Sequence, residues 1–156
     1  MTRVFSYTQA IDANIVDAFC LLQKGFTDQF VYYRKEAPVR FMGLGRCVAV
    51  SSLEDIDTTL EGPIAEHPVM FSFNRFDGAN PAPTDELFSS FPQLKLLLPE
   101  VVLIENERGA FLQVNSLGPV YPGRVRRFSR DCERAPEHSS GPIPYRLEPD
   151  SREAWQ

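Results

Sequence analysis

The sequence has few cysteines and no long apolar run. Among its 156 residues, the three cysteines (Cys20, Cys47 and Cys132) are odd in number and far apart, with no Cys-x-x-Cys pair. This pattern excludes a disulfide framework and a cysteine-based zinc site, and it is typical of reduced thiols in the cytoplasm. Apolar runs such as 96–98 and 101–104 are far shorter than the roughly 20 residues that span a membrane. The N-terminus also lacks the unbroken apolar stretch of a signal peptide, so we expect a cytoplasmic protein without a membrane partner.

Familiar catalytic motifs are missing too. The chain contains no Gly-x-Ser-x-Gly, no His-Glu-x-x-His, no phosphate-binding P-loop and no paired catalytic carboxylates. The two histidines, His67 and His138, are isolated, and neither has a second ligand at metal spacing. Asp77 stands in an Asp-Gly pair after a predicted strand, where its side chain is expected to hold a turn. From the residues alone we therefore predict no catalytic residue, no metal site and no cofactor site.

The chain carries fewer positive than negative charges. Sixteen Lys and Arg residues stand against twenty-one Asp and Glu residues, and the net charge of −5 argues against nucleic acid as the main partner. The exception is the stretch "RVRRFSRDCER" at 124–134, which has five arginines in eleven residues. An anion-binding patch is one interpretation, since arginine pairs well with phosphate and carboxylate. A solvated, charged face is the other, and the acidic balance of the whole chain favours it.

The Gly-Leu-Gly step at 43–45 invites comparison with a dinucleotide-binding loop. That loop needs a third glycine and a helix that begins directly after the turn. Here the residues that follow, 46–50, are typical of a continuing strand, so we reject nucleotide binding. Glycines inside a strand instead mark a bulge or the close approach of another backbone.

Hydrophobic periodicity predicts helices alternating with hairpins. Apolar residues recur at three- and four-residue steps from Ile11 to Leu22, before a glycine stop at Gly25, which predicts a helix. The stretches 30–34 and 39–50 are rich in aromatic and β-branched residues and predict a β-hairpin. The further predicted elements are helices within 51–62 and 84–91, a strand over 68–76, and a hairpin over 100–118 that turns at "NERG" (106–109).

These elements predict an α+β domain: an antiparallel β-sheet built from several hairpins, with helices packed on it. Residues 1–116 form the predicted core. The stretch 117–149 contains six prolines and little apolar periodicity, so it is interpreted as a Pro- and Arg-rich connector. Asp150 and Glu153 form a capping box, which predicts that 150–156 begins the helix leading into a further domain.

Three stretches, spread from residue 30 to residue 156, carry a family resemblance. They are "FVYYRKEAPVRFMGLGRCVAV" (30–50), the block from "PVMFSFNRFDG" (68–78) through "LFSSFPQLKLLLPEVVLIENERGAFLQV" (87–114), and "PDSREAWQ" (149–156). Their order and spacing resemble the N-terminal region of the chorismate-utilising enzymes, in particular the isochorismate synthases. Two details depart from the family pattern: Ser72-Phe73-Asn74 replaces a Gly-Gly pair, and no tryptophan stands near Leu87. The Leu-Leu-Glu-Ser segment with which anthranilate synthases bind inhibitory tryptophan is also absent, which favours isochorismate synthase.

The resemblance implies a supporting role. In these enzymes the lysine that activates water, the glutamate that acts as general acid and the glutamates that hold Mg²⁺ all lie in the C-terminal half, and nothing in 1–156 matches their motifs. The chain is then an inactive N-terminal fragment of an isochorismate synthase, which converts chorismate to isochorismate in menaquinone or siderophore biosynthesis. Its partner is the C-terminal half.

Two alternatives stay open. One is a stand-alone small α+β binding module that uses the arginine stretch as its contact surface. The other is the N-terminal region of a different family member, such as anthranilate or aminodeoxychorismate synthase. If the core is shared with a second half, the strands at 30–34 and 69–76 lose their cover, and we expect self-association there.

Overall fold

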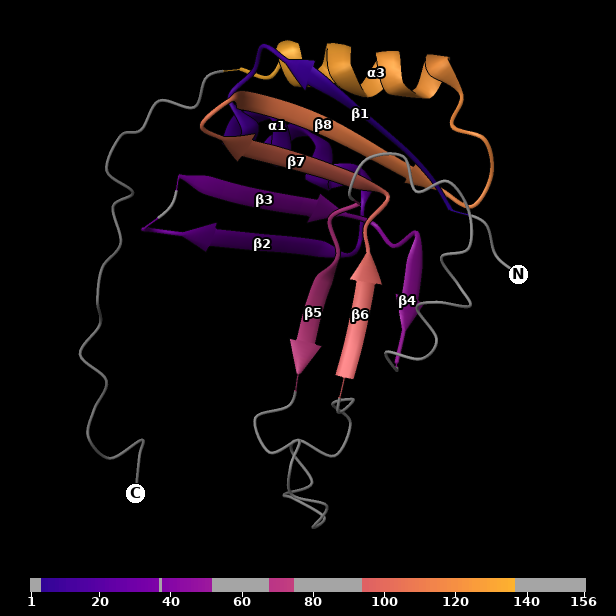
Figure 1. The fold of residues 1–156 in the computed structure, drawn as a ribbon. Helices are drawn as coiled ribbons and strands as arrows, with labels where there is room; N and C mark the ends of the chain where they lie inside the picture. The colour runs from indigo at the N-terminus through magenta and orange to yellow at the C-terminus, as the bar shows by residue number, and fades with distance from the viewer. Residues whose placement is uncertain (1–3, 37, 52–67, 75–93, 137–156) are drawn as a thin grey trace, which may run out of the picture.

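The computed structural model describes residues 4–36, 38–51, 68–74 and 94–136. They form a mixed α+β structure with two antiparallel sheets and two α-helices, shown in Figure 1. This result confirms the expectation of an α+β domain built on antiparallel strands. Apart from Ser51, the helices predicted within 51–62, 84–91 and 150–156 lie outside the described residues.

The larger sheet has five strands in the order β1-β8-β7-β3-β2, and every neighbouring pair is antiparallel. Its strands are β1 (Phe5–Ile11), β2 (Gln29–Arg34), β3 (Val39–Leu44), β7 (Val101–Asn106) and β8 (Gly109–Ser116). The two hairpins expected from the sequence, β2-β3 and β7-β8, are confirmed. The sequence pattern does not predict β1, because its partner β8 lies far along the chain.

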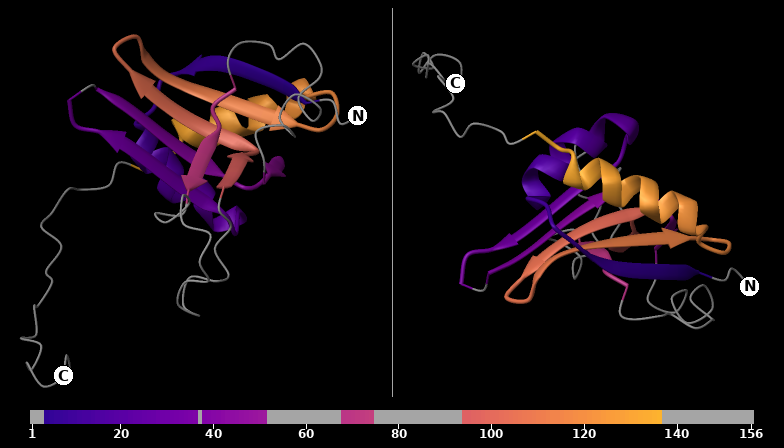
Figure 2. Two further views of the ribbon diagram at one scale, coloured as in Figure 1. Left: turned by 60° about the horizontal axis from the view of Figure 1, so that its bottom comes forward. Right: turned by 90° about the horizontal axis from the view of Figure 1, so that it is seen from above.

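Helices cover one face of this sheet (Figure 2). The first, α1 (Ile15–Leu22), is capped by Asn14, whose Oδ1 accepts hydrogen bonds from the backbone N–H groups of Val16 and Asp17 at 2.9 and 3.2 Å. A 3₁₀ turn, Gln23–Gly25, follows it and ends at the predicted glycine. The helix begins four residues later than the apolar spacing predicts, because Ile11 ends β1.

The second helix, α3 (Pro122–Glu133), lies within the stretch 117–149 and corrects its interpretation as a connector for these residues, whereas 137–149 lies outside the described residues. Val125, Ser129 and Cys132 recur at helical spacing and are buried, so α3 belongs to the packed core. Pro122 occupies the first turn, where its missing N–H costs no hydrogen bond, so this proline starts a helix. Within the described parts of the chain, neither helix is long and apolar enough to cross a membrane.

The main core lies between the two helices and the sheet. Leu44, Leu103, Leu112 and Val114 come from three strands, and all are fully buried together with Ile15 of α1. Burial of each large aliphatic side chain contributes about 1.5–3 kcal/mol. This packing fixes one face of the sheet and leaves the opposite face to other contacts.

The smaller sheet has the order β4-β6-β5 and runs away from the larger one (Figure 1). Its strands are β4 (Val48–Val50), β5 (Phe71–Asn74) and β6 (Leu94–Leu98). The strand predicted over 68–76 is therefore confirmed in part by β5. The sequence pattern does not predict β6, because "LKLLL" shows no alternation of polar and apolar residues.

A corner joins the two sheets. β3 ends at Leu44 and β4 begins at Val48, so the single strand expected over 39–50 is wrong. Gly45 turns the chain there with a φ of 71°, a backbone conformation that L side chains rarely adopt. Beside it, the N–H of Cys47 donates to the carbonyl of Leu98 at 2.8 Å, which holds the two segments together as they round the corner.

Candidate functional site

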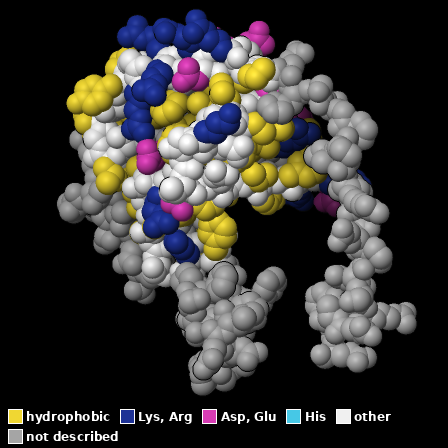
Figure 3. Space-filling model, turned by 180° about the vertical axis from the view of Figure 1, so that it is seen from behind, with side chains coloured by type: hydrophobic (Ala, Val, Ile, Leu, Met, Phe, Trp, Pro, Cys, Tyr) yellow, Lys and Arg dark blue, Asp and Glu magenta, His cyan; other side chains and the backbone are white. Residues whose placement is uncertain are grey.

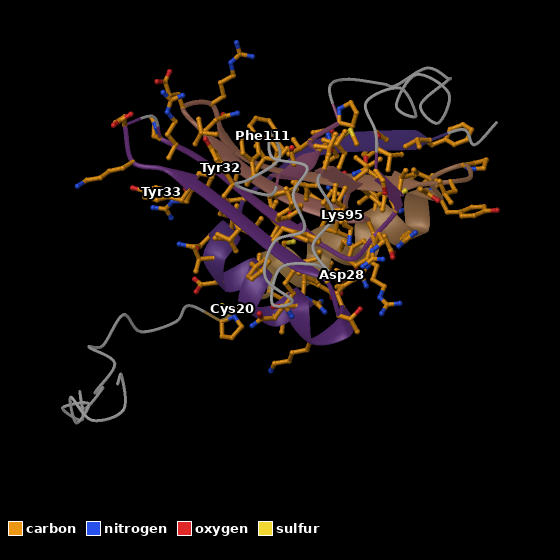
Figure 4. All side chains as sticks on the ribbon, turned by 90° about the horizontal axis from the view of Figure 1, so that it is seen from below. Cys20, Asp28, Tyr32, Tyr33, Lys95 and Phe111 are labelled. Carbon is orange, nitrogen blue, oxygen red and sulfur yellow. The ribbon has the colours of Figure 1, made fainter. Side chains whose placement is uncertain are left out.

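Aromatic side chains gather on the face of the five-stranded sheet that lies opposite the helices. The strand register aligns Tyr32, Phe41, Ile104 and Phe111 in one row across β2, β3, β7 and β8. The rings of Tyr32 and Phe41 have centroids 6.1 Å apart. Tyr32 is 50% exposed, while Phe41 and Phe111 are half-buried. Figure 4 shows Tyr32 and Phe111 on the same side of the sheet.

The smaller sheet adds further aromatic rings to this row. Phe30 of β2 packs against Phe71 and Phe73 of β5, with ring centroids 5.5 and 5.6 Å apart. Phe71 is buried, and Phe73 is 44% exposed. We call the resulting surface the aromatic face, and it comprises Phe30, Tyr32, Phe41, Phe73 and Phe111.

Gly43 makes room for this packing. It pairs with Phe30 in the β2-β3 ladder, and a Cβ at this position would lie 2.7 Å from Cγ of Pro99 and 2.9 Å from Cε2 of Phe71. A close approach to this strand glycine is therefore present, as the sequence predicts, but the approaching groups are two side-chain rings and not another backbone. Both glycines of the Gly-Leu-Gly step thus have structural roles, Gly43 beneath the aromatic rings and Gly45 at the corner.

A buried glutamine ties the smaller sheet to the larger one. Oε1 of Gln113 accepts a hydrogen bond from the backbone N–H of Val69 at 3.0 Å, just before β5 begins. Nε2 of the same side chain donates to Oγ1 of Thr8 on β1 at 3.1 Å. Gln113 is almost completely buried, so these bonds replace the ones it would make to water.

A buried asparagine likewise links separate segments by hydrogen bonds at the corner. Nδ2 of Asn115 donates to the carbonyl of Pro99 at 2.8 Å, and Oδ1 accepts from Oγ of Ser6 at 2.6 Å. The predictions from the sequence do not include Gln113 or Asn115. The available signal was two amides at alternate positions of β8, on the same face of an otherwise apolar strand.

Arginine side chains cover the outer side of α3, along the top of the view in Figure 3. Arg126, Arg127 and Arg130 are exposed, which agrees with a solvated, charged helix face. Arg124 is different, because its Nη2 lies 2.7 Å from Oε2 of Glu100. This ion pair connects α3 to the corner between the sheets and engages the guanidinium.

Four carboxylates line a cavity of about 670 Å³ beside the start of α1. They belong to Asp12, Asp17, Glu105 and Glu133, and Glu105 also pairs with Arg40 at 3.3 Å. In the part of the chain that the structure describes, no group of three or more His, Cys, Asp or Glu residues could hold a metal ion. The cavity therefore offers negative charge without a preformed metal site.

The three cysteines are free thiols in the structure. Burial, and then the negative charge of Glu100, raises the pKa of the Cys47 thiol from its usual 9.0 to about 11. Burial, and then the charges of Asp131 and Glu133, raises the pKa of the Cys132 thiol to about 12. The raised pKa values favour the protonated form of both thiols, which is a weaker nucleophile than the thiolate.

The remaining candidates from the sequence, His67, Asp77 and His138, lie outside the described residues. Among the surfaces that are described, the aromatic face is the one on which side chains of one kind lie together in register. Its chemistry suits the binding of another apolar surface, and it contains no acid–base pair. No protein-family model matches the sequence, and no curated protein matches it either.

Proposed function

We propose that this chain is the N-terminal part of a chorismate-utilising enzyme, in particular an isochorismate synthase, and that it supports the catalytic half. In this proposal the conversion of chorismate to isochorismate, with Mg²⁺, takes place entirely in a C-terminal half. The resemblance of the stretches 30–50 and 87–114 supports the assignment. The chain itself contributes packing surface and no catalytic group.

The observation that carries the proposal is the incomplete cover of the aromatic face. Helices bury one face of the five-stranded sheet, while on the aromatic face Tyr32 and Phe73 remain about half exposed beside three further rings. Contiguous exposed aromatic surface on a folded domain marks an interaction site. A second half that places a sheet or a helix on these rings completes the core of the parent enzyme.

The test recombines the two halves. Tagged 1–156 is co-expressed with the downstream half that the proposal requires in the same reading frame, and isochorismate is measured by mass spectrometry with chorismate and Mg²⁺. We expect the halves to copurify, the pair to form isochorismate, and 1–156 alone to match the blank. A stop codon directly after Gln156 overturns the proposal and favours a stand-alone module that binds through the arginines of α3. A downstream half that is fully active by itself overturns the supporting role.

A matched pair of variants locates the contact. Tyr32→Asp places a charge on the aromatic face, whereas Tyr121→Asp places one on a side chain that is 73% exposed outside it. An aromatic anchor of an interface is worth about 2 kcal/mol, so we expect Tyr32→Asp to weaken binding of the second half about 30-fold. Tyr121→Asp should leave the affinity unchanged. Equal effects of the two variants contradict docking on the aromatic face.

A further inference from the structure

We propose that β2 is a self-complementary edge strand through which two copies of this chain pair antiparallel, joining their five-stranded sheets into one. The strand order places β2 at the outer edge, with β3 as its neighbour in the sheet. Its centre is apolar and exposed, with Val31 60% and Tyr33 57% accessible. No proline interrupts it and no charged residue lies within Gln29–Tyr33, so the strand itself lacks two of the common devices that prevent edge-to-edge pairing.

The hydrogen bonds of the ladder show which backbone groups of β2 are free to pair. The N–H of Gly45 donates to the carbonyl of Asp28 at 2.9 Å, which extends the register in which Gln29 lies opposite Leu44. Along an antiparallel strand, the backbone N–H and C=O groups of successive residues face alternately toward the neighbouring strand and away from it. Even-numbered residues of β2 therefore bond to β3. The N–H and C=O groups of Gln29, Val31 and Tyr33 point to the open edge.

These three residues define the pairing register. When Val31 lies opposite Val31 of the second copy, Gln29 lies opposite Tyr33, and all three outward-facing residues form hydrogen-bonded pairs. Each pair exchanges two N–H···O bonds, which gives about six bonds across the interface. A shift of the register in either direction leaves at least one outward-facing residue of each strand without a partner in the other. The two-fold axis consequently passes midway between the two Val31 residues.

The side chains agree with this register. On the aromatic face, Phe30 lies opposite Tyr32 of the second copy, and aromatic cross-strand pairs stabilise sheets. Asp28 lies opposite Arg34 of the second copy, so opposite charges meet at both ends of the interface. Arg34 has a loose, exposed contact to Glu36 at 3.9 Å, and Asp28 keeps its pair with Arg46 at 3.1 Å.

Pairing through β2 is independent of the proposed function. The new hydrogen bonds lie in the plane of the sheet, so they leave the aromatic face open to a second half. Tyr32 belongs to that face, whereas Tyr33 lies on the opposite side of β2, toward Cys20 and α1 (Figure 4). Experiments on 1–156 alone therefore test the dimer, and its failure leaves the recombination of the halves untouched.

Engineered cysteines test the register directly. Val31→Cys places two thiols opposite each other at a Cα distance of about 5.5 Å, which suits a disulfide. Tyr33→Cys places them roughly 14 Å apart, because each lies four residues along the strand from its copy, and this exceeds disulfide reach. Under mild oxidation we expect a crosslinked dimer of Val31→Cys and none of Tyr33→Cys. A mixture of Gln29→Cys and Tyr33→Cys should crosslink into a heterodimer. The parent chain, which has Cys20, Cys47 and Cys132, is the control.

A proline variant tests the edge without disturbing the fold. The N–H of Val31 faces outward, so Val31→Pro removes a donor of the dimer and none of the β2-β3 ladder. Sedimentation of the parent chain should show a concentration-dependent dimer, whereas Val31→Pro should remain monomeric with an unchanged circular dichroism spectrum. A parent chain that stays monomeric up to about 1 mM, the weak end of specific association, overturns the proposal. So does a Tyr33→Cys dimer that forms as readily as the Val31→Cys dimer.

Discussion

Gly43 is a position where a single added methyl group should destabilise the fold. A Cβ added there would lie 2.7 Å from Cγ of Pro99 and 2.9 Å from Cε2 of Phe71. Neither ring can move freely, because Pro99 is buried and its carbonyl accepts from Asn115, while Phe71 is packed against Phe30. We therefore expect Gly43→Ala to push the smaller sheet away from the larger one.

The magnitude follows from two opposing effects. Overpacking a close-packed site costs about 1–3 kcal/mol. Alanine also restricts the unfolded chain relative to glycine, which offsets about 0.4–1 kcal/mol of that cost. The net loss is about 1.5 kcal/mol, and at about 3 °C per kcal/mol for a chain of this length the midpoint temperature falls by about 4–5 °C.

Urea unfolding followed by circular dichroism measures this loss. Gly118→Ala is the matched control, because a Cβ there would meet no atom within 4 Å. The control should unfold within about 0.5 kcal/mol of the parent, as surface substitutions usually do. If Gly43→Ala unfolds at the same urea concentration as Gly118→Ala, the packing of Pro99 and Phe71 over Gly43 is wrong.

Two further predictions concern α3 and the thiols. Val125→Asp buries an unpaired charge in the core and should lower the free energy of unfolding by more than about 3 kcal/mol. Arg126→Asp on the exposed side of α3 should be nearly neutral. Equal unfolding midpoints of the two variants would mean that α3 is not packed in the core. The pKa of Cys47 is raised to about 11 and that of Cys132 to about 12. Their contribution to the stability of the fold is therefore fully present below pH 9, the usual pKa of a thiol, and is lost as the pH rises through the raised pKa values. Alkylation of the folded protein at pH 8 should therefore be slower at both than after unfolding, and rates equal to those of the unfolded chain would contradict the raised values.

The sequence predicts best where structure is local. The β7-β8 hairpin is confirmed because Glu107 and Arg108 form a tight two-residue turn between two strongly apolar strands. The first helix is confirmed for a similar reason, since its cap, its apolar spacing and its glycine end lie within a dozen residues. The predicted start of this helix is wrong, because Ile11 fits the helical spacing and the burial pattern of β1 equally well.

The corner and α3 could not be predicted because their causes are distant in sequence. The bend after Leu44 depends on Gly45 and on the Leu98 carbonyl that receives Cys47, and no local pattern reveals that contact. In α3 the buried side is formed by a valine, a serine and a cysteine among arginines, a weak apolar signal that the neighbouring prolines further obscure. The aromatic face could be expected at 30–34 and 69–76, but its continuation across β7 and β8 required the strand register.

The rings of the aromatic face are held in place before any partner arrives. Gln113 bonds the backbone just ahead of β5, Gly43 admits the ring of Phe71, and Phe71 and Phe73 both contact Phe30. Side chains fixed in this way lose little conformational entropy on association, whereas a flexible aromatic side chain loses about 0.5–1.5 kcal/mol when it is immobilised. A preformed apolar surface therefore binds a second apolar surface more tightly than its area alone implies. That property suits the proposed docking of a second half, and the bond from Gln113 to the backbone ahead of β5 contributes to it.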